Sequence, residues 1–318
     1  MYHSVGDELP DPWSIRVTPK YFEEHLEVLK RLSKSMAFSN FAKANQEKTL
    51  EHGSVAVTFD DGYANNLHRA KPLLEKYEIP GTVFVASDFV KEGKHYWWDL
   101  LSEVLLSPGR LPDRLQLEVD GLQKEWLLGS AADYSVQEAN DQSRTLASEA
   151  EPGSRLRFFY EIWEAIHVAP VETHLPLLEQ ICAWAGKPFD PPIDSYRPMN
   201  PDELILLEQG GLVGVGGHTA NHPQLSFQSE GVQRDEIFRC KTDLEAMLNH
   251  PVTGFAYPYG GRSSATVSLV EEAGFRHAVT TYQESVWYRS RPFELPRIEI
   301  TNIDGDEFER RLTAWLNR

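Results

Sequence analysis

Short apolar runs alternate with segments of helical spacing along most of this chain, and this alternation limits the folds open to it. Runs rich in β-branched and aromatic residues, which are typical of buried strands, occur at 54–59, 82–86, 212–215, 254–257 and 277–281. Helical spacing occurs at 21–32, 67–77 and 264–273, and Asn200-Pro201 marks the start of a further helix. Strands that alternate with helices favour a mostly parallel α/β sheet, open or closed into a barrel.

Residues from about 91 to 197 break this alternation. The stretch is rich in Leu, Glu and Trp, has helical spacing at 97–106 and 157–166, and offers few strand signals. The length of 318 residues suits either two average domains or one α/β barrel with an insertion. We therefore expect a single domain over 1–318 with a mainly helical insertion at approximately 91–197.

Composition excludes several classes of partner. A net charge of -17 repels phosphate backbones and anionic lipid surfaces, so we expect no nucleic-acid partner. No uncharged apolar run approaches the roughly 18 residues of a membrane span. Two cysteines, Cys182 and Cys240, cannot build a disulfide framework. The oligomeric state is not indicated.

The amino-terminal residues set the expectation for localisation. They contain neither a basic region nor an apolar core of a secretory signal, which favours a cytoplasmic protein. The strand that would carry Tyr2 begins part-way along, however, so we expect upstream residues to be missing. A periplasmic or envelope location stays open for that reason.

Two adjacent carboxylates follow the first clear strand. Asp60 and Asp61 stand directly after 54–59 and before Gly62. In barrels, the carboxyl ends of the strands carry the catalytic residues. Because neighbouring side chains point in different directions, one carboxylate can bind a metal ion while the other accepts a proton. Asp and Gly at a strand end also suit an ordinary turn, so this pair alone decides nothing.

Two histidines stand at the end of a later strand. His218 and His222 are four residues apart, and a turn of backbone between them would aim both imidazoles at one ion. Pro223 disfavours helical conformation at His222, so we expect a loop here. Surface or core histidines also occur at this spacing by chance. The position on the same rim as Asp61 favours metal binding.

Together the two motifs resemble those of the polysaccharide deacetylases of the NodB-homology group, which are carbohydrate esterase family 4-like. Residues 58–62 match the Thr-Phe-Asp-Asp-Gly of the first family motif, and 218–222 match its His-Ser/Thr-x-x-His motif. The similarity covers most of the chain outside the expected insertion. It also includes Tyr2-His3 and residues 212–217, 257–260, 271–281 and 295–298.

The resemblance implies a distorted, TIM-like (β/α) barrel of about seven strands and one divalent ion held by Asp61, His218 and His222. Zn²⁺ is the expected ion, with Co²⁺, Ni²⁺ or Fe²⁺ as alternatives for this ligand set. Three protein ligands leave a position for a water molecule, which Asp60 would deprotonate as it attacks an amide carbonyl. The implied reaction is hydrolytic deacetylation of an N-acetylated sugar in a polysaccharide or glycan precursor.

The resemblance also assigns roles to the later motifs. Tyr257 and Tyr259 are expected to bind substrate, and the backbone N–H of Tyr259 to stabilise the oxyanion. Many family members carry an Arg that orients the catalytic Asp, but the equivalent position here is Ala256. Arg297 is a candidate to hold substrate or to orient Asp60, and a structural ion pair is the alternative.

The general acid departs from the family pattern. The family uses a late histidine, and no histidine follows His277 in this sequence. His277 starts a strand and is expected to face the opposite end. We expect His3 to act instead, because Tyr2-His3 would end the first barrel strand on the catalytic rim. A hydrogen-bonded structural histidine is the alternative reading of His3.

Aromatic and acidic residues open the expected insertion. Trp98 and Asp99 can stack on a sugar ring and bind its hydroxyl groups, and they follow the 82–86 strand closely. Packing at a helix start is the alternative explanation for the two tryptophans at 97 and 98.

Two other functions stay open at this stage. The absent Arg and late His are compatible with a metal-dependent amidohydrolase that acts on a small non-sugar amide. A non-catalytic, sugar-binding relative is the third possibility. The intact Asp60 argues against the latter, since binding alone needs no base beside a metal site.

Overall fold

The computed structural model describes residues 1–119, 121–189 and 196–317. Within it the chain forms two compact units. Unit 1 comprises residues 1–7, 15–94 and 196–318, and unit 2 comprises residues 8–14 and 95–195. Residues 120 and 190–195 of the expected insertion, and residue 318 of the expected domain, lie outside the described residues. The expected limits of 91 and 197 for an insertion stay a prediction.

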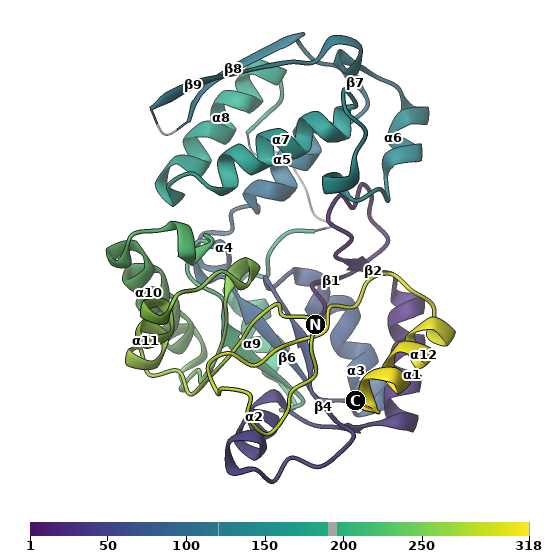
Figure 1. Cartoon of the computed structure of the whole chain (residues 1–318), viewed down its shortest axis with the longest axis vertical. Helices are drawn as coiled ribbons and strands as arrows, with labels where there is room; N and C mark the ends of the chain where they lie inside the picture. Colours follow the sequence, from purple (N-terminus) through teal and green to yellow (C-terminus); the bar gives the residue numbers. More distant parts are fainter. Residues whose placement is uncertain (120, 190–195, 318) are drawn as a thin grey trace. The chain divides into compact units, whose positions relative to one another are not determined.

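A curled parallel sheet forms the centre of unit 1 (Figure 1). Its five strands run in the order β13-β12-β11-β6-β5, and each neighbouring pair is parallel. The strands are β5 (Val57–Phe59), β6 (Gly81–Val85), β11 (Val213–Gly217), β12 (Gly254–Ala256) and β13 (His277–Val279). All five overlap the apolar runs identified from the sequence, because strands buried on both faces read as continuous apolar runs.

Two irregular segments continue the sheet at its edges. Beside β5, the Tyr2 N–H donates to the Thr58 carbonyl over 2.8 Å. Beside β13, Leu295 forms a parallel bridge with Val279. The two segments also meet each other, since the Ile300 N–H donates to the Met1 carbonyl over 3.0 Å. Five strands and these two segments make a ring of seven, and the predicted distorted α/β barrel is confirmed.

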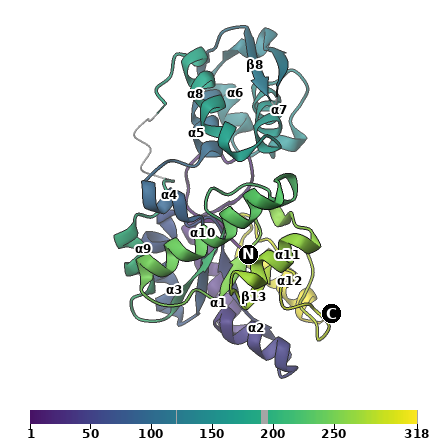
Figure 2. The same ribbon diagram turned by 90° about the vertical axis from the view of Figure 1, so that its left-hand side faces the viewer.

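Helices surround the sheet of unit 1 (Figures 1 and 2). They are α1 (Pro19–Leu32), α2 (Phe38–Glu47), α3 (Lys71–Tyr77), α4 (Ser87–Glu92), α9 (Pro201–Glu208), α10 (Glu230–Leu248), α11 (Ser264–Glu272) and α12 (Gly305–Leu316), with a π-helical turn at Asn66–Ala70. The start predicted for α9 is confirmed: Asn200 and Glu203 form a capping box, and Pro201 occupies the first turn. Short parallel pairs, β1 (Ser4–Val5) with β2 (Arg16–Val17) and β3 (Lys34–Ser35) with β4 (Ser54–Val55), complete the unit.

Unit 2 is mainly helical, as its composition predicts. Its elements are α5 (Trp97–Leu106), β7 (Gly109–Arg110), β8 (Arg114–Val119), β9 (Leu122–Leu127), β10 (Asp133–Tyr134), α6 (Val136–Gln142), α7 (Arg155–His167) and α8 (His174–Ala185). Helices α5, α7 and α8 pack together around an aromatic cluster in which Trp13, Trp97 and Trp163 are in contact. The antiparallel β8–β9 hairpin is a feature that the sequence reading did not predict.

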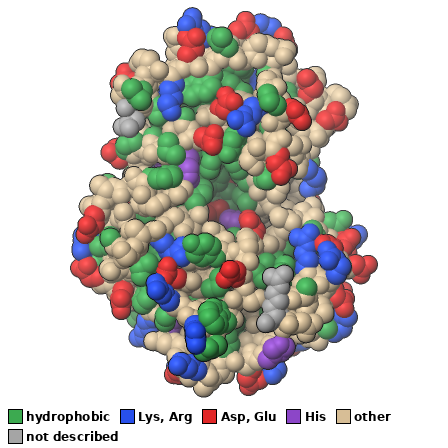
Figure 3. Space-filling view, viewed as in Figure 1, with side chains coloured by type: hydrophobic (Ala, Val, Ile, Leu, Met, Phe, Trp, Pro, Cys, Tyr) green, Lys and Arg blue, Asp and Glu red, His purple; other side chains and the backbone are tan. Residues whose placement is uncertain are grey.

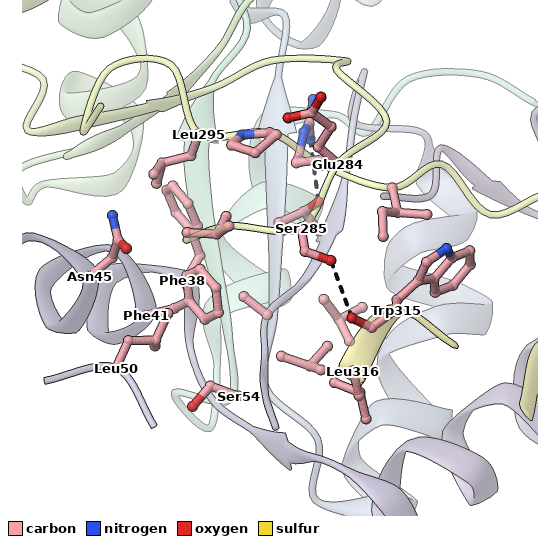
Figure 4. Close-up of a pocket in the computed structure, with 18 of the residues that line it drawn as sticks. Phe38, Phe41, Asn45, Leu50, Ser54, Glu284, Ser285, Leu295, Trp315 and Leu316 are labelled. Carbon is pink, nitrogen blue, oxygen red and sulfur yellow. Dashed lines mark hydrogen bonds between the residues drawn. The ribbon is translucent and has the colours of Figure 1, made fainter. Parts of the chain in front are cut away.

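A cavity of about 450 Å³ lies in unit 1 beside β4 and the start of β5 (Figure 4). Its walls are mostly apolar and come from α2, β4, the start of β5, α12 and residues 284–288, with Phe38, Phe41 and Trp315 among them. Neither carboxylate of the Asp60-Asp61 pair and neither histidine of the second motif lines it. Arg297 does line it, so this cavity reaches one of the predicted site residues without reaching the Asp and His side chains of the two motifs.

Two further features of the molecule are the distribution of charged side chains on its surface and the length and apolarity of its helices. Acidic and basic side chains are interspersed on the face seen in Figure 3. Among the described residues, no helix is both long enough and apolar enough to cross a membrane.

Candidate metal and catalytic site

The turn after β5 places Asp60 and Asp61 side by side with buried side chains. Asp61 has φ +74° and Gly62 has φ +94°, so the chain reverses through two left-handed residues. Gly62 suits this position, because a Cβ there would lie 3.2 Å from the Val85 side chain as well as carrying a strained φ. The Asp61 carbonyl is held by the Ala86 N–H at 3.2 Å.

The two histidines lie in a loop after β11, as Pro223 predicts. The first, His218, is fixed at the strand end, where its N–H donates to the Val85 carbonyl over 2.9 Å. Within the loop, Thr219 and His222 have positive φ angles of 63° and 59°. The Thr219 hydroxyl accepts the His222 N–H over 3.0 Å and thereby holds the turn that brings the second imidazole back.

Asp61, His218 and His222 converge on one point and form a buried group whose ligand atoms lie within 4.8 Å of one another. The Asp61 Oδ1 atom is 3.5 Å from His218 Nε2 and 3.2 Å from His222 Nε2. The two Nε2 atoms are 3.1 Å apart. A tetrahedral ion with bonds of about 2.0–2.1 Å separates its ligands by about 3.3 Å, so these residues fit a zinc-sized ion.

One of the candidate ligands, His218, is oriented by a second contact. His218 Nδ1 lies 2.7 Å from the Ala256 carbonyl oxygen, which can only accept a hydrogen bond. The proton of a neutral His218 ring therefore belongs on Nδ1, and the Nε2 lone pair faces Asp61. Such a contact fixes both tautomer and ring orientation in metal sites.

Asp60, the predicted base, is held by Arg297. The guanidinium donates to both carboxylate oxygens over 2.6 Å. Further donations, to the Thr280 carbonyl (3.0 Å) and the Thr58 hydroxyl (3.3 Å), fix the guanidinium itself. Both partners are buried, with Asp60 2% and Arg297 7% exposed. The contact is a buried ion pair that fixes the orientation of Asp60, and the catalytic and substrate-binding roles considered for Arg297 stay predictions.

Electrostatics keep both carboxylates ionised. Burial raises the pKa of Asp60, but the charges of Arg297 and His218 and the hydrogen bonds from Arg297 bring it below the ordinary value. Burial also opposes ionisation of Asp61, and the close contacts with the His218 and His222 side chains outweigh it, so the pKa of Asp61 is lowered as well. An ionised Asp60 can accept a proton, and an ionised Asp61 can bind a cation.

The two tyrosines of the third motif lie in different environments. Tyr257 is fully buried, and its hydroxyl donates to the Phe293 carbonyl over 3.0 Å. Tyr259 is partly exposed, has φ +56°, and places its ring 4.8 Å from the His222 ring. Tyr259 thus lies beside the metal-binding group, whereas the side chain of Tyr257 packs in the core. The substrate roles predicted for both stay predictions.

His3 lies near the two carboxylates, close enough for its charge to lower the pKa of both Asp60 and Asp61. Its backbone is fixed from the segment after the Asp-Asp-Gly turn, since Asn66 Nδ2 donates to the His3 carbonyl over 2.8 Å. His3 is partly exposed. The structure therefore brings the predicted acid to the predicted base, while its role in proton transfer stays a prediction.

Trp98 and Asp99 belong to unit 2, in the first turn of α5. Both are buried at 4% exposure, and the Trp98 ring stacks on Tyr96 with centroids 4.7 Å apart. The contacts described for these residues lie within unit 2. Their predicted role in substrate binding stays a prediction.

Sequence reasoning gave no role to Glu236, a buried residue of α10 that contacts the histidine loop. The sequence does contain a signal for this residue. Glu236 shares a helical face with Ile237, Cys240 and Leu244, all of which are buried. A carboxylate on the apolar face of an amphipathic helix calls for a partner, because an unpaired buried charge is costly.

Comparison with known proteins relates the chain to one family. The model of the family described as "Polysaccharide deacetylase" matches residues 47–110 and 186–278. The putative polysaccharide deacetylase YxkH of Bacillus subtilis (strain 168) is 30% identical over 106 residues. That match covers 33% of this chain and 37% of YxkH, so it spans well under two thirds of the relative's length.

Solved structures share the fold along nearly the whole chain. A de-N-acetylase from Aggregatibacter actinomycetemcomitans has a TM-score of 0.58 at 13% identity and covers 98% of this chain and 97% of its own. The Streptococcus pyogenes deacetylase PplD, in complex with acetate, has a TM-score of 0.56 at 18% identity, covering 98% and 96%. IcaB from Ammonifex degensii has a TM-score of 0.55 at 15% identity, covering 99% and 100%.

Proposed function

Because this chain belongs to the polysaccharide deacetylase family, we propose that it hydrolyses the acetamide group of an N-acetylated sugar, in a polysaccharide or a glycan precursor. One observation carries the proposal. A buried Asp61-His218-His222 group of metal-ligand geometry stands directly beside Asp60, an ionised carboxylate held in one orientation. A metal site needs no such neighbour for binding alone.

We propose that Asp61, His218 and His222 hold one divalent ion, with Zn²⁺ as the expected species. Two imidazoles and a carboxylate suit Zn²⁺, and Co²⁺, Ni²⁺ or Fe²⁺ are compatible with the same donors. When bound, the ion acidifies a water molecule and polarises the amide carbonyl. The protein contributes the orientation, through the His218 contact to the Ala256 carbonyl and the Thr219 contact to His222.

Asp60 acts as the general base in this proposal. It accepts the proton of the attacking water, and its position within the barrel is set by the two hydrogen bonds from Arg297. Arg297 therefore supplies the orienting contact that Ala256 cannot. A base held by such a pair is already oriented before the reaction, so it has little orientational freedom left to lose. This is how positioning contributes to rate.

Two further groups complete the proposed reaction. The Tyr259 N–H stabilises the negative charge that develops on the carbonyl oxygen, since Tyr259 lies against His222. His3 donates a proton to the leaving amine, because it lies near both carboxylates and follows Tyr2, whose carbonyl accepts the Asp60 N–H. The products are acetate and a free amino sugar.

Acetate release from N-acetylglucosamine oligomers tests the function. Wild-type protein loaded with Zn²⁺ is expected to release acetate, and Asp60→Asn to release it at least about 100-fold more slowly, as loss of a general base predicts. Asp243→Asn is the matched control, because Asp243 pairs with Lys91 and takes no part in the proposed chemistry.

Three outcomes would contradict this proposal. Equal acetate release by wild type and Asp60→Asn would remove Asp60 from the chemistry. Turnover of a cyclic imide or ureide, with no acetate released from any N-acetylated sugar in the panel, would assign the chain to small amides instead. Sugar binding without turnover in the presence of added Zn²⁺ or Co²⁺ would make it a binding protein.

A further inference from the structure

We propose that Glu236 is a positioning residue for the metal site: its carboxylate holds the peptide between the two histidine ligands and so sets the affinity for the ion. The inference rests on the metal site proposed above. Glu236 touches neither histidine side chain in the contacts described, and it acts through the backbone of residues 220 and 221.

Glu236 is placed by α10, whose buried face packs towards the sheet. It is 1% exposed. Its Oε2 atom accepts the N–H of Ala220 over 3.0 Å and that of Asn221 over 2.7 Å. Its Oε1 atom accepts the Asn221 side-chain amide over 2.8 Å. Three donors of one loop therefore converge on a single carboxylate.

The loop needs such a support because its conformation is intrinsically unfavourable. Thr219 and His222 both have left-handed φ angles, which are unfavourable for residues that carry a Cβ atom. Strained backbone persists only where surrounding contacts over-determine it. Glu236 contacts the two residues that lie between the strained positions, and so opposes relaxation of the loop that carries both ligands.

The other edge of the same peptide is held from α4. The Ser87 N–H donates to the Thr219 carbonyl over 3.1 Å, and the Asp88 N–H donates to the Ala220 carbonyl over 3.0 Å. The loop is thus clamped between α4 and α10. On the α10 side the clamp is a carboxylate, and hydrogen bonds to a charged group are stronger than those between neutral groups.

Charge around Glu236 is balanced within the cluster. Burial raises the pKa of Glu236, while hydrogen bonds from Asn221 and the charge of Arg239 lower it, with a net rise. Arg239, one turn further along α10, lies 3.4 Å from Glu236 and 2.8 Å from Asp88. Glu236, Arg239 and Asp88 therefore link α10 to α4, the two helices that clamp the loop.

Metal affinity tests the inference in the full chain. Zn²⁺ affinity is measured by chelator competition, and the geometry of the site by the visible absorption of bound Co²⁺. Glu236→Ala is expected to weaken Zn²⁺ binding about 10- to 100-fold, the usual range for loss of a group that orients metal ligands, and to alter the Co²⁺ spectrum. Glu236→Gln, which keeps the shape and one acceptor, is expected to lie between wild type and Glu236→Ala.

Gln233→Ala is the matched control. Gln233 lies one turn earlier on α10, is buried, and bonds Thr266 (2.6 Å) and the Gln228 carbonyl (2.9 Å) rather than the histidine loop. Its loss should lower the unfolding midpoint without changing Zn²⁺ affinity. This control separates a general loss of stability from an effect on the site.

Each contrary result has a distinct meaning. If Glu236→Gln and every folded Glu236 variant bind Zn²⁺ as tightly as wild type with an unchanged Co²⁺ spectrum, the positioning role is overturned while the metal site stands. If Gln233→Ala weakens binding as much as Glu236→Ala, the effect is one of stability and the inference is equally overturned. If wild type takes up no ion, the proposed site itself fails, and this inference with it.

Discussion

Arg297 and Asp60 form a two-pronged ion pair inside the barrel, with both N···O distances at 2.6 Å. The two residues are 237 positions apart in the chain and meet because the segment after β13 runs beside the amino-terminal segment that carries Met1 and Tyr2 and closes the ring. A guanidinium matches a carboxylate in this way with two parallel hydrogen bonds, which fixes the plane of the carboxylate as well as its position.

Replacement of Arg297 should therefore affect rate more than substrate binding. We expect Arg297→Lys to lower kcat by about 10- to 100-fold with a smaller change in KM, because an ammonium group cannot hold both oxygens in plane and small misplacement of a base is costly. Steady-state kinetics of acetate release measure the effect. Arg262→Lys is the control, since Arg262 also pairs with a carboxylate, that of Glu294, but contacts neither catalytic Asp in the interactions described. Unchanged kcat in Arg297→Lys would argue against an orienting role.

Removal of a metal ligand should abolish both ion content and turnover. His222→Ala leaves one imidazole and one carboxylate, so we expect less than about a tenth of the wild-type ion content after dialysis, given the cost of losing one of three donors. Inductively coupled plasma mass spectrometry measures this directly. His250→Ala is the comparison: His250 is exposed, bonds Glu208, and should retain full ion content. Equal ion content in both variants would contradict the ligand set.

Chelation of the wild-type protein makes a separate prediction. A strong chelator should lower the thermal unfolding midpoint, because an ion that binds only the folded state stabilises it. Addition of Zn²⁺ should restore both the midpoint and acetate release. In His222→Ala, the midpoint should no longer respond to the chelator. A wild-type midpoint that is indifferent to the chelator would count against a resident ion.

Sequence patterns were sufficient for the barrel strands because these strands are buried on both faces. Residues 54–59 and 82–86 read as continuous apolar runs, and the structure places β5 and β6 there. The ring closure by residues 295–300 could not be seen in this way. It uses isolated bridges and single hydrogen bonds, which impose no residue periodicity.

The candidate site likewise contains residues that short motifs predict and residues that only the fold brings together. Asp61 and the two histidines lie in short motifs, where spacing along the chain already restricts spacing in three dimensions. The partner of Asp60 is 237 residues away, so the sequence could not decide between substrate binding, orientation of Asp60 and a structural ion pair as the role of Arg297. Glu236 was missed because its function depends on which loop meets α10, and topology rather than local pattern decides that.

His3 should act on the leaving group and not on the metal. We expect His3→Gln to lower the rate of amide hydrolysis by about 10²-fold or more, as for loss of a general acid, and to leave ion content unchanged. Hydrolysis of an aryl acetate ester supplies the second readout. The leaving group of this ester departs without protonation, so His3→Gln should hydrolyse it at close to the wild-type rate. His277→Gln, a buried histidine at the start of β13, is the control. Equal loss on amide and ester would point to a structural role for His3.

Acid stability should depend on Glu203. Arg197 donates to both of its carboxylate oxygens, over 2.6 and 2.7 Å, and the pair stands at the start of α9. The hydrogen bonds from Arg197, against the opposing effect of burial, lower the pKa of Glu203 from 4.5 to about 2. A depressed pKa contributes stability that is fully present above pH 4.5 and is lost as the pH falls towards 2. Linkage gives a loss of about 2 kcal/mol between pH 6 and pH 3 from this group.

The test compares how much the urea midpoint falls between pH 6 and pH 3 in matched variants. Glu203→Gln should be less stable than wild type at pH 6 and should lose less on acidification, because the titrating carboxylate is gone. Glu51→Gln is the control. Glu51 pairs with Lys34 on the surface, where both side chains are more than half exposed and solvent screens the pair. We therefore expect the urea midpoint of Glu51→Gln to fall between pH 6 and pH 3 as much as that of wild type. If the midpoint of Glu203→Gln also falls as much as that of wild type, the acid-labile stability does not come from the Glu203–Arg197 pair.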